Sequence, residues 1–298
     1  MNTSDLNLFI RIVETCSITE AAKQLDITPA AVSLALRRLE KETDIQLFIR
    51  TTRQIRITPQ GEQFLFHCRQ ALESLEQGQA AAHQMQGKIS GNLRLSVSSD
   101  FGRNIVLPWI DELADLHPTL SIDFNVGDSL SDFFIDHVDV VLRYGKPKDS
   151  TMIAFHIATM DRITCASPQY ISQFGAPATP DDLKKHNCLL HRKDARLFSN
   201  WEYKDKLNNY RVKVDSNKVS NDTDIVRRWA INGKGIAYRS QIDVTVDLRS
   251  GKLVQLLPDY QSPSVELYLI CPSRKQVSPA VIALRELLRD KCTKMIGI

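Results

Sequence analysis

The chain has 298 residues and a formal net charge of +3, and 43% of its residues are hydrophobic and 24% are charged. This length suggests about two domains. No run approaches the roughly 18 to 20 apolar residues of a membrane span, and the first residues lack a secretory pattern. We therefore expect a cytoplasmic protein with no membrane partner. Its six cysteines are scattered without a CxxC pair, so we expect no metal, cofactor or disulfide framework.

The charge of the first 91 residues is balanced, with ten basic and ten acidic side chains, but its distribution is uneven. Arg50, Arg53 and Arg56 lie together, and no acidic residue occurs between positions 46 and 61. A local basic patch of this kind is what contact with nucleic-acid phosphates requires.

Residues 17–40 have the pattern of two short helices separated by a tight turn at Asp26 and Ile27. Thr28 is suited to cap the second helix, and Pro29 falls at its first position, where a missing N–H costs little. Three apolar side chains of the second helix would face inward: Val32, Leu36 and Leu39. The pattern is typical of a helix-turn-helix whose second helix is presented outward. An ordinary helical hairpin within a larger core is the alternative.

Residues 47–61 read LFIRTTRQIRITPQG, which predicts a short β-hairpin, or wing, with its turn near positions 52–54. Its Arg50 and Arg53 would lie beside the second helix, where cations can contact the phosphate backbone or the minor groove. Simple solvated surface is the competing interpretation of these arginines.

A long helix is predicted from Gln60 to Gln86, with one interruption at Gly78, and would be about 40 Å long. Its apolar residues form a narrow seam at near-heptad spacing, which favours pairing with a second copy of the helix. These residues are Phe64, Cys68, Ala71, Leu72, Leu75 and Ala82. Residues 87–91, GKISG, break the helix and indicate a domain boundary.

From Asn92 onward, predicted strands and helices alternate, which indicates a mostly parallel α/β sheet. A second unit begins near Ile163, so we expect a two-lobed binding fold of the periplasmic-binding-protein kind, with lobe I at 92–162 and 266–298 and lobe II at 163–265. Ligands of such folds collect where strands end. The candidate effector-binding residues are Ser98, Ser99, Asp100, Phe101, Gly127, Asp128, Arg143, Asn221 and Asp222. Helix starts after Ser99 and Asn221 would suit an anion, although simple capping or turn roles are equally open.

The sequence resembles the LysR-type transcriptional regulators over essentially its full length. The N-terminal segments that carry the resemblance are SITEAAKQL, ITPAAVSLALRRLEKE and LFIRTTRQIRITPQG. The regulatory half matches more loosely, through FGRNIVLP, NVGDSLSDF, DVVLRYG, ASPQYI and AINGKGIAY.

The resemblance implies a winged helix-turn-helix at 1–58, a linker and dimerisation helix at 59–87, and an effector-binding regulatory domain at 92–298. It implies a dimer, often a tetramer, that binds double-stranded promoter DNA and a small-molecule effector and acts on RNA polymerase. By position, the DNA-binding residues would be Thr28, Pro29, Ala30, Ser33, Leu34 and Arg37 in the helix and Arg50 and Arg53 in the wing. The chain departs from the family at Leu34, where a polar or basic residue is common, and at Asp44, which replaces a glycine.

Three alternatives differ from an effector-controlled regulator. An α/β enzyme is disfavoured because the seven histidines show no HExxH spacing and no GxSxG occurs. A solute-binding protein would fit only the second half of the chain. Redox sensing by Cys165 or Cys188 on the same scaffold is the third alternative.

Overall fold

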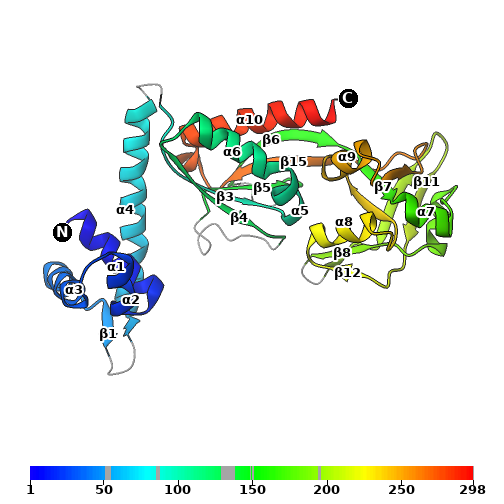
Figure 1. The fold of residues 1–298 in the computed structure, drawn as a ribbon. Helices are drawn as coiled ribbons and strands as arrows, with labels where there is room; N and C mark the ends of the chain where they lie inside the picture. Colours follow the sequence, from blue (N-terminus) through cyan, green and yellow to red (C-terminus); the bar gives the residue numbers. More distant parts are fainter. Residues whose placement is uncertain are drawn as a thin grey trace. The chain divides into compact units, whose positions relative to one another are not determined.

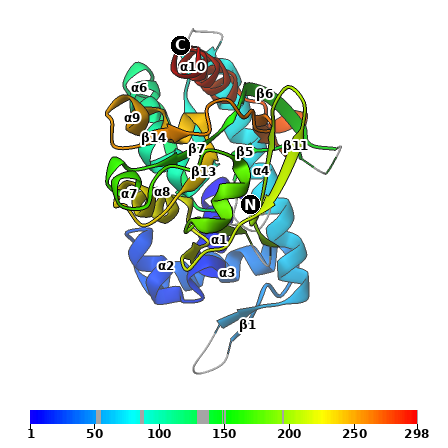
Figure 2. The same cartoon turned by 90° about the vertical axis from the view of Figure 1, so that its right-hand side faces the viewer.

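The computed structural model describes residues 1–50, 55–84, 88–128, 138–147, 149, 151–193 and 196–297 (Figures 1 and 2). The chain divides into two compact units, Met1–Ala82 and His83–Ile298. No helix in the described part of the chain is long and apolar enough to cross a lipid bilayer.

Three helices form the core of the N-terminal unit: α1 (Thr3–Thr15), α2 (Ile18–Gln24) and α3 (Pro29–Thr43). The predicted inward face of α3 is confirmed, because Val32, Leu36 and Leu39 are completely buried against the other two helices. The turn between α2 and α3 is made by Asp26 in the left-handed conformation (φ 53°). The two helices therefore form the helix-turn-helix that the spacing predicts.

The ends of α3 are fixed by local hydrogen bonding and backbone conformation. The Thr28 hydroxyl accepts a hydrogen bond from the Ala31 N–H at 3.2 Å, so its predicted role as the N-cap is confirmed. Asp44 ends the helix in the left-handed conformation (φ 54°) that glycine usually supplies. The departure at this position therefore leaves a normal helix end, at some cost in conformational energy.

The wing is present as strands β1 (Phe48–Arg50) and β2 (Ile55–Ile57), which pair antiparallel with Phe48 opposite Ile57. Its predicted turn lies outside the described residues. Helix α4 (Pro59–Gln84) follows and runs as one helix through Gly78, so the long helix predicted from Gln60 is confirmed as far as Gln84. The first part of the predicted seam, Phe64, Cys68 and Leu72, packs against the core of its own unit, whereas Leu75 is 53% exposed.

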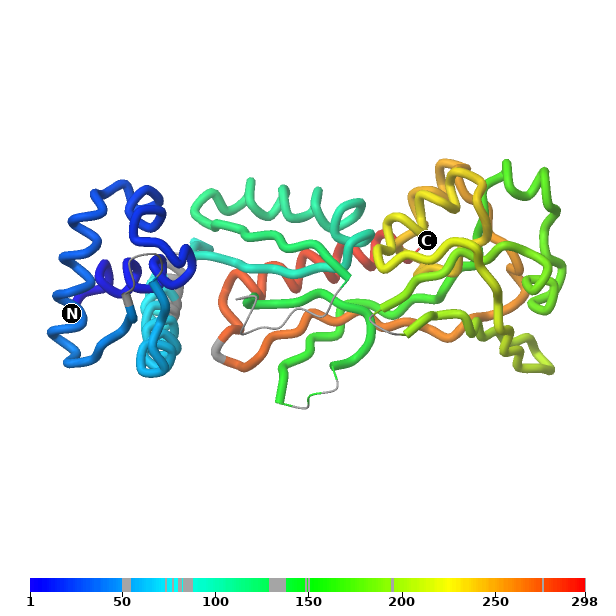
Figure 3. The backbone as a smooth tube through the Cα atoms, turned by 90° about the horizontal axis from the view of Figure 1, so that it is seen from below, coloured from blue at the N-terminus to red at the C-terminus, as the bar shows by residue number. Residues whose placement is uncertain are grey.

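The second unit contains two lobes. Lobe I is built on a five-stranded sheet in the order β4-β3-β5-β15-β6. Its strands are β3 (Gly91–Val97), β4 (Leu120–Val126), β5 (Val140–Tyr144), β6 (Ile153–Met160) and β15 (Val265–Cys271). Strand β3 is parallel to β4 and β5, but β15 is antiparallel to β5 and β6. The expectation of a mostly parallel sheet is therefore wrong, because β15 returns from lobe II in the opposite direction (Figure 3).

Helices pack against this sheet and supply much of its apolar core. They are α5 (Ser99–Phe101), a π-helical turn (Gly102–Val106), α6 (Leu107–Leu116) and α10 (Pro279–Ile296). Since α5, the π turn and α6 follow one another without a gap, the helix start predicted at Ser99 is confirmed. Figure 1 shows α10 lying along the sheet near β6.

Lobe II consists of small sheets covered by helices. Strand β7 (Arg162–Ala166) is central in one sheet, between the antiparallel β13 (Ala237–Ser240) and β14 (Val254–Leu256). The remaining strands are β8 (Leu190–Lys193), β9 (Arg196–Leu197), β10 (Asn200–Lys204), β11 (Asn209–Lys213) and β12 (Val219–Ser220). The helices are α7 (Pro168–Phe174), α8 (Thr223–Ile231) and α9 (Gln241–Arg249), with a 3₁₀ turn at Pro180–Lys185. A second 3₁₀ turn, Arg274–Gln276, lies between β15 and α10 in lobe I. The helix start predicted after Asn221 is confirmed by α8.

We predict opposite effects for two glycines of α4. A Cβ atom at Gly61 would lie 2.5 Å from the carbonyl oxygen of Leu47 and 2.8 Å from Cγ1 of Ile57, whereas nothing lies within 4 Å at Gly78. Gly61→Ala should destabilise the N-terminal unit by about 1–3 kcal/mol, and Gly78→Ala should stabilise α4 by about 0.5–1 kcal/mol. Hydrogen exchange in α1–α4 of the full chain measures both. Equal effects of the two substitutions would contradict the packing at Gly61.

Candidate DNA-binding face and effector pocket

The outer face of α3 carries most of the residues predicted to bind DNA. Thr28, Pro29, Ala30, Leu34 and Arg37 are exposed, and Ser33 is half-buried. Leu34 is 68% exposed, which is unusual for a leucine on a helix whose opposite face forms the core. Arg50 ends strand β1, and Arg53 lies outside the described residues.

The two adjacent arginines of α3 differ in their surroundings. Arg38 forms an ion pair with the buried carboxylate of Asp5 on α1, so it fastens α3 to the core. Arg37 makes no side-chain hydrogen bond or ion pair with any residue that the structure describes. Of these two arginines, Arg37 is therefore the one that remains available to a phosphate or a base.

In the second unit, the carboxylate of Asp128 joins the two lobes. One of its oxygens accepts from the backbone N–H of Ser99 at the start of α5, at 2.8 Å. The other accepts from the backbone N–H of Thr223 at the start of α8, at 2.7 Å, and from the Thr223 hydroxyl at 2.9 Å. Burial alone would raise the pKa of Asp128, but these hydrogen bonds outweigh it and hold the pKa below its usual value. Asp128 thus places a carboxylate where a helix start suits an anion.

A second group of contacts between the lobes is charged and buried. Asp100 of α5 accepts from Arg239 of β13 at 2.6 Å, and Arg239 also pairs with Asp243 of α9 at 3.0 Å. The Tyr144 hydroxyl of β5 donates to Asp243 at 2.6 Å. At the edge of this group, Arg103 pairs with Asp222 at 3.1 Å.

Carboxylates outnumber arginines in this cluster. Asp100, Asp224, Asp243 and Asp247 are all buried and share Arg227 and Arg239. Burial is the main reason that the pKa of Asp100 is raised to about 7, with repulsion from Asp243 adding to it and attraction to Arg239 opposing it. The pKa of Asp243 is also raised, chiefly by burial. The cluster therefore retains a proton at a pH where an exposed aspartate would have lost it.

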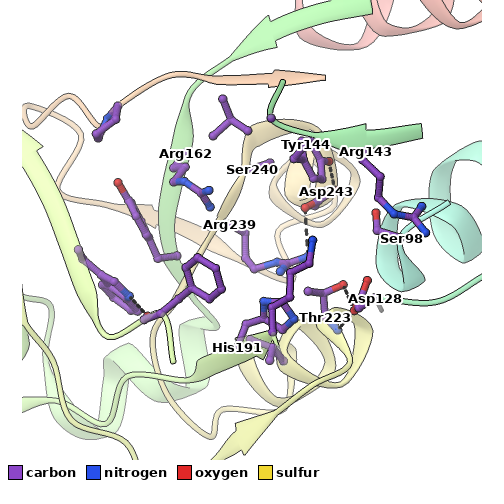
Figure 4. Close-up of a pocket in the computed structure, with 18 of the residues that line it drawn as sticks. Ser98, Asp128, Arg143, Tyr144, Arg162, His191, Thr223, Arg239, Ser240 and Asp243 are labelled. Carbon is purple, nitrogen blue, oxygen red and sulfur yellow. Dashed lines mark hydrogen bonds and ion pairs between the residues drawn. The ribbon is translucent and has the colours of Figure 1, made fainter. Parts of the chain in front are cut away.

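Beside these contacts lies a pocket of about 580 Å³ lined by both lobes (Figure 4). This volume is in the range of small-molecule sites. Lobe I contributes Ser98, Asp128, Arg143 and Tyr144, and lobe II contributes Arg162, His191, Thr223 and Arg239 among others. Burial lowers the pKa of Arg143 to about 10, partly offset by attraction to Asp128.

Three of the nine predicted effector residues, Ser98, Asp128 and Arg143, line this pocket. Ser99, Asp100 and Asp222 take part in the contacts between the lobes. Phe101 is buried in the lobe I core against Trp109 and Tyr144. Gly127 donates its N–H to Val97, Asn221 is exposed, and Asp222 rather than Asn221 caps α8.

Sequence reasoning missed Arg162, His191 and Arg239. Arg239 lies within the strand sequence GIAYRS, as Arg143 lies within VVLRYG. A cation within an apolar strand was therefore a signal that could have identified Arg239 in the same way as Arg143. His191 and Arg162 carried no comparable signal, since they lie at strand ends.

Two family models match the chain. The bacterial regulatory helix-turn-helix protein of the lysR family matches residues 3–62, and the LysR substrate binding domain matches residues 86–293. The chain belongs to the LysR family. This LysR-type chain is a DNA-binding transcriptional regulator with an effector-binding domain.

Its curated relatives have the same architecture over nearly their whole length. The HTH-type transcriptional regulator DmlR of Escherichia coli (strain K12) is 34% identical over 287 residues, which cover 96% of this chain and 93% of DmlR. The transcriptional activator TtdR of the same organism is 32% identical over 296 residues, which cover 98% and 94% of the two chains.

Solved structures of full-length LysR regulators are also similar. The Vibrio cholerae virulence activator AphB aligns with a TM-score of 0.57 and 25% identity, over 100% of this chain and 99% of AphB. CrgA of Neisseria meningitidis aligns with a TM-score of 0.62 and 24% identity, over 98% and 99% of the two chains. The two-part fold of this LysR regulator is therefore that of its family.

The surroundings of Cys165 and Cys188 argue against redox sensing by these two residues. Cys165 and Cys188 are completely buried, and burial raises the pKa of each thiol to about 12. The reactive thiolate is therefore disfavoured at both positions.

We predict that Asp100→Asn changes how the stability of this regulator depends on pH. A folded-state pKa near 7, above the usual 3.8, means that the folded chain binds one more proton between these pH values. This contribution to stability is complete below about pH 4 and is lost as the pH rises to 7. The free energy of unfolding of Asp100→Asn, measured relative to that of the wild type, should therefore rise with pH across this interval, by up to about 1.4 kcal/mol per pH unit. Thermal unfolding at several pH values measures it.

The exposed Asp111 of α6 supplies the control. Asp111→Asn should follow the wild-type pH profile. If the stability of Asp100→Asn also depends on pH as that of the wild type does, the prediction is wrong, and Asp100 is already ionised in the folded protein across this interval.

Proposed function

We propose that this LysR regulator reads promoter DNA with the outer face of α3 and the wing, and that an effector in the pocket between its two lobes controls the response. The observation that carries the proposal is the pocket itself, because its walls come from both lobes and adjoin the contacts that hold them together. An occupant can therefore favour one arrangement of the lobes over another.

The DNA-binding part of the proposal uses Thr28, Pro29, Ala30, Ser33, Leu34, Arg37, Arg50 and Arg53. Arg37 and the wing arginines would bind phosphates or bases, and phosphate contacts set the register of α3 in the major groove. The exposed Leu34 would contact the methyl group of a thymine, which is the apolar feature of that groove.

Assembly is part of the same proposal. The exposed Leu75 and the later turns of α4 would pair with a second copy to form a homodimer, and tetramers would follow from further contacts. Two recognition helices would then occupy successive major grooves. We propose that residues 1–58, 59–87 and 92–298 act as the DNA-binding, linker and regulatory parts of a cytoplasmic protein that influences RNA polymerase.

We predict that Leu34 gives the protein a preference for thymine over deoxyuracil. The experiment begins by mapping the DNA bound in the genome and then replaces single thymines of one site by deoxyuridine, which lacks the methyl group. At the contacted position the wild type should bind the deoxyuridine site roughly 5-fold more weakly, as expected from about 1 kcal/mol of lost apolar contact. Leu34→Ala should bind both sites alike.

Arg37→Ala and Arg11→Ala are the matched controls for this measurement. Arg37→Ala should weaken binding to both sites by the same factor while the thymine preference remains. Arg11 is paired with Glu14 on α1, so Arg11→Ala should change neither quantity. If Leu34→Ala keeps the full thymine preference at every position, the proposed role of Leu34 is wrong.

A further inference from the structure

We propose that the effector is a small organic acid whose carboxylate binds to Arg162, Arg239 and His191 on the lobe II side of the pocket. The inference rests on the proposed function, because it names the chemical class of the molecule that the pocket takes. Figure 4 shows Arg162, Arg239 and His191 on the lobe II side of the pocket, where they line the same cavity.

The helix starts themselves are not open to an external anion. The N–H groups of Ser99 and Thr223, which begin α5 and α8, already donate to Asp128. The Ser99 and Thr223 hydroxyls are engaged with the same carboxylate and with each other. A negatively charged ligand placed there would meet the Asp128 carboxylate, so its charged group must bind elsewhere in the pocket.

Two buried polar atoms of the lining have no hydrogen-bond partner in the described structure, Nε of Arg239 and Nε2 of His191. The Nη2 atom of Arg239 is already used by Asp100 and Asp243. A buried donor that lacks an acceptor costs about 1–3 kcal/mol. At Nε of Arg239 this cost is removed when a ligand supplies an oxygen atom.

Arg162 supplies the positive charge. Its side chain makes no ion pair or hydrogen bond within the described ranges, and its guanidinium carbon lies over the ring of Tyr238, 5.6 Å from the ring centroid. Burial lowers the pKa of Arg162, with repulsion from Arg239 contributing. A desolvated guanidinium without a carboxylate partner is costly, and an anionic ligand would compensate it with two parallel hydrogen bonds.

The acidic residues of the pocket already have partners within the protein. Asp243 pairs with Arg239, Glu202 with Arg211 at 3.6 Å, and Glu266 accepts from Tyr268 at 3.1 Å. The lobe II side of the lining combines apolar and aromatic side chains with further polar ones. The apolar and aromatic residues are Leu189, Phe198, Trp201, Val226 and Tyr238, and the polar ones include Lys193, Arg196 and Asn200. A cationic site beside such walls suits an organic acid rather than an inorganic ion.

The test uses the full-length protein and four acids, acetate, malonate, succinate and benzoate, each compared with its amide at constant ionic strength. Calorimetric titration should find saturable binding of at least one acid and at least tenfold weaker binding of its amide. Arg162→Gln should weaken binding of that acid at least tenfold. Arg192 follows His191 on β8, is exposed and is absent from the lining, so Arg192→Gln should bind like the wild type.

Three results would overturn the inference. These are saturable binding of none of the acids, equal binding of an acid and its amide, and unchanged affinity in Arg162→Gln. A further measurement needs no ligand: Arg162→Met removes an uncompensated charge and should raise the melting temperature of the free protein. A lower melting temperature would assign Arg162 a structural role instead and would also overturn the inference.

A separate experiment tests the proposed function, so that its failure can be told apart from failure of the inference. Ser264 is an exposed residue at the pocket, and Ser264→Trp should obstruct it. If a compound changes the DNA footprint of the wild type and of Ser264→Trp equally, the pocket is not the effector site. If the compound acts through the pocket but is neutral or cationic, only the chemical class proposed here is wrong.

Discussion

The regulatory half of the protein depends on a single carboxylate, that of Asp128, which is bound by the starts of two helices from different lobes. The two backbone N–H groups, of Ser99 and Thr223, have no partner within their helices, and each start carries a partial positive charge. Asp128 satisfies both at 2.8 and 2.7 Å. Because the same carboxylate serves both helices, the lobes cannot separate at this point without leaving buried polar groups unpaired.

The remaining contacts between the lobes follow from this arrangement. With α5 and α8 held side by side, Asp100 reaches Arg239 and Asn104 reaches Asp224 at 2.9 Å. Four carboxylates and two arginines then share a space with little water, which raises the pKa of Asp100 to about 7, chiefly through burial. The pocket lies next to these contacts, so its shape depends on the same few hydrogen bonds. The proposed effector would act here through small movements, since a packed interface responds to displacements of less than an ångström.

The local elements of the fold could be predicted from sequence, because caps and periodicity are local. Thr28 and Pro29 define the start of α3, and the spacing of Val32, Leu36 and Leu39 gives its buried face. The direction of β15 could not be predicted, since it depends on a strand pairing across more than a hundred residues. For the same reason, sequence reasoning placed Ser98, Asp128 and Arg143 at the pocket but missed Arg162 and His191, which come from the other lobe. It also took Ser99 and Asp100 for ligand-binding residues, because an internal partner and an external ligand require the same polar groups.

The central claim, that Asp128 joins the two helix starts, can be tested by hydrogen exchange on the full-length Asp128→Asn protein. The asparagine amide has the size of the carboxylate, but it is uncharged and has only one oxygen that can accept a hydrogen bond. It therefore cannot accept from both helix starts as the carboxylate does. The account predicts faster exchange at residues 99–102 of α5 and at residues 223–226 of α8 together, with α10 unchanged. Faster exchange at only one of the two helix starts, or at neither, would contradict it.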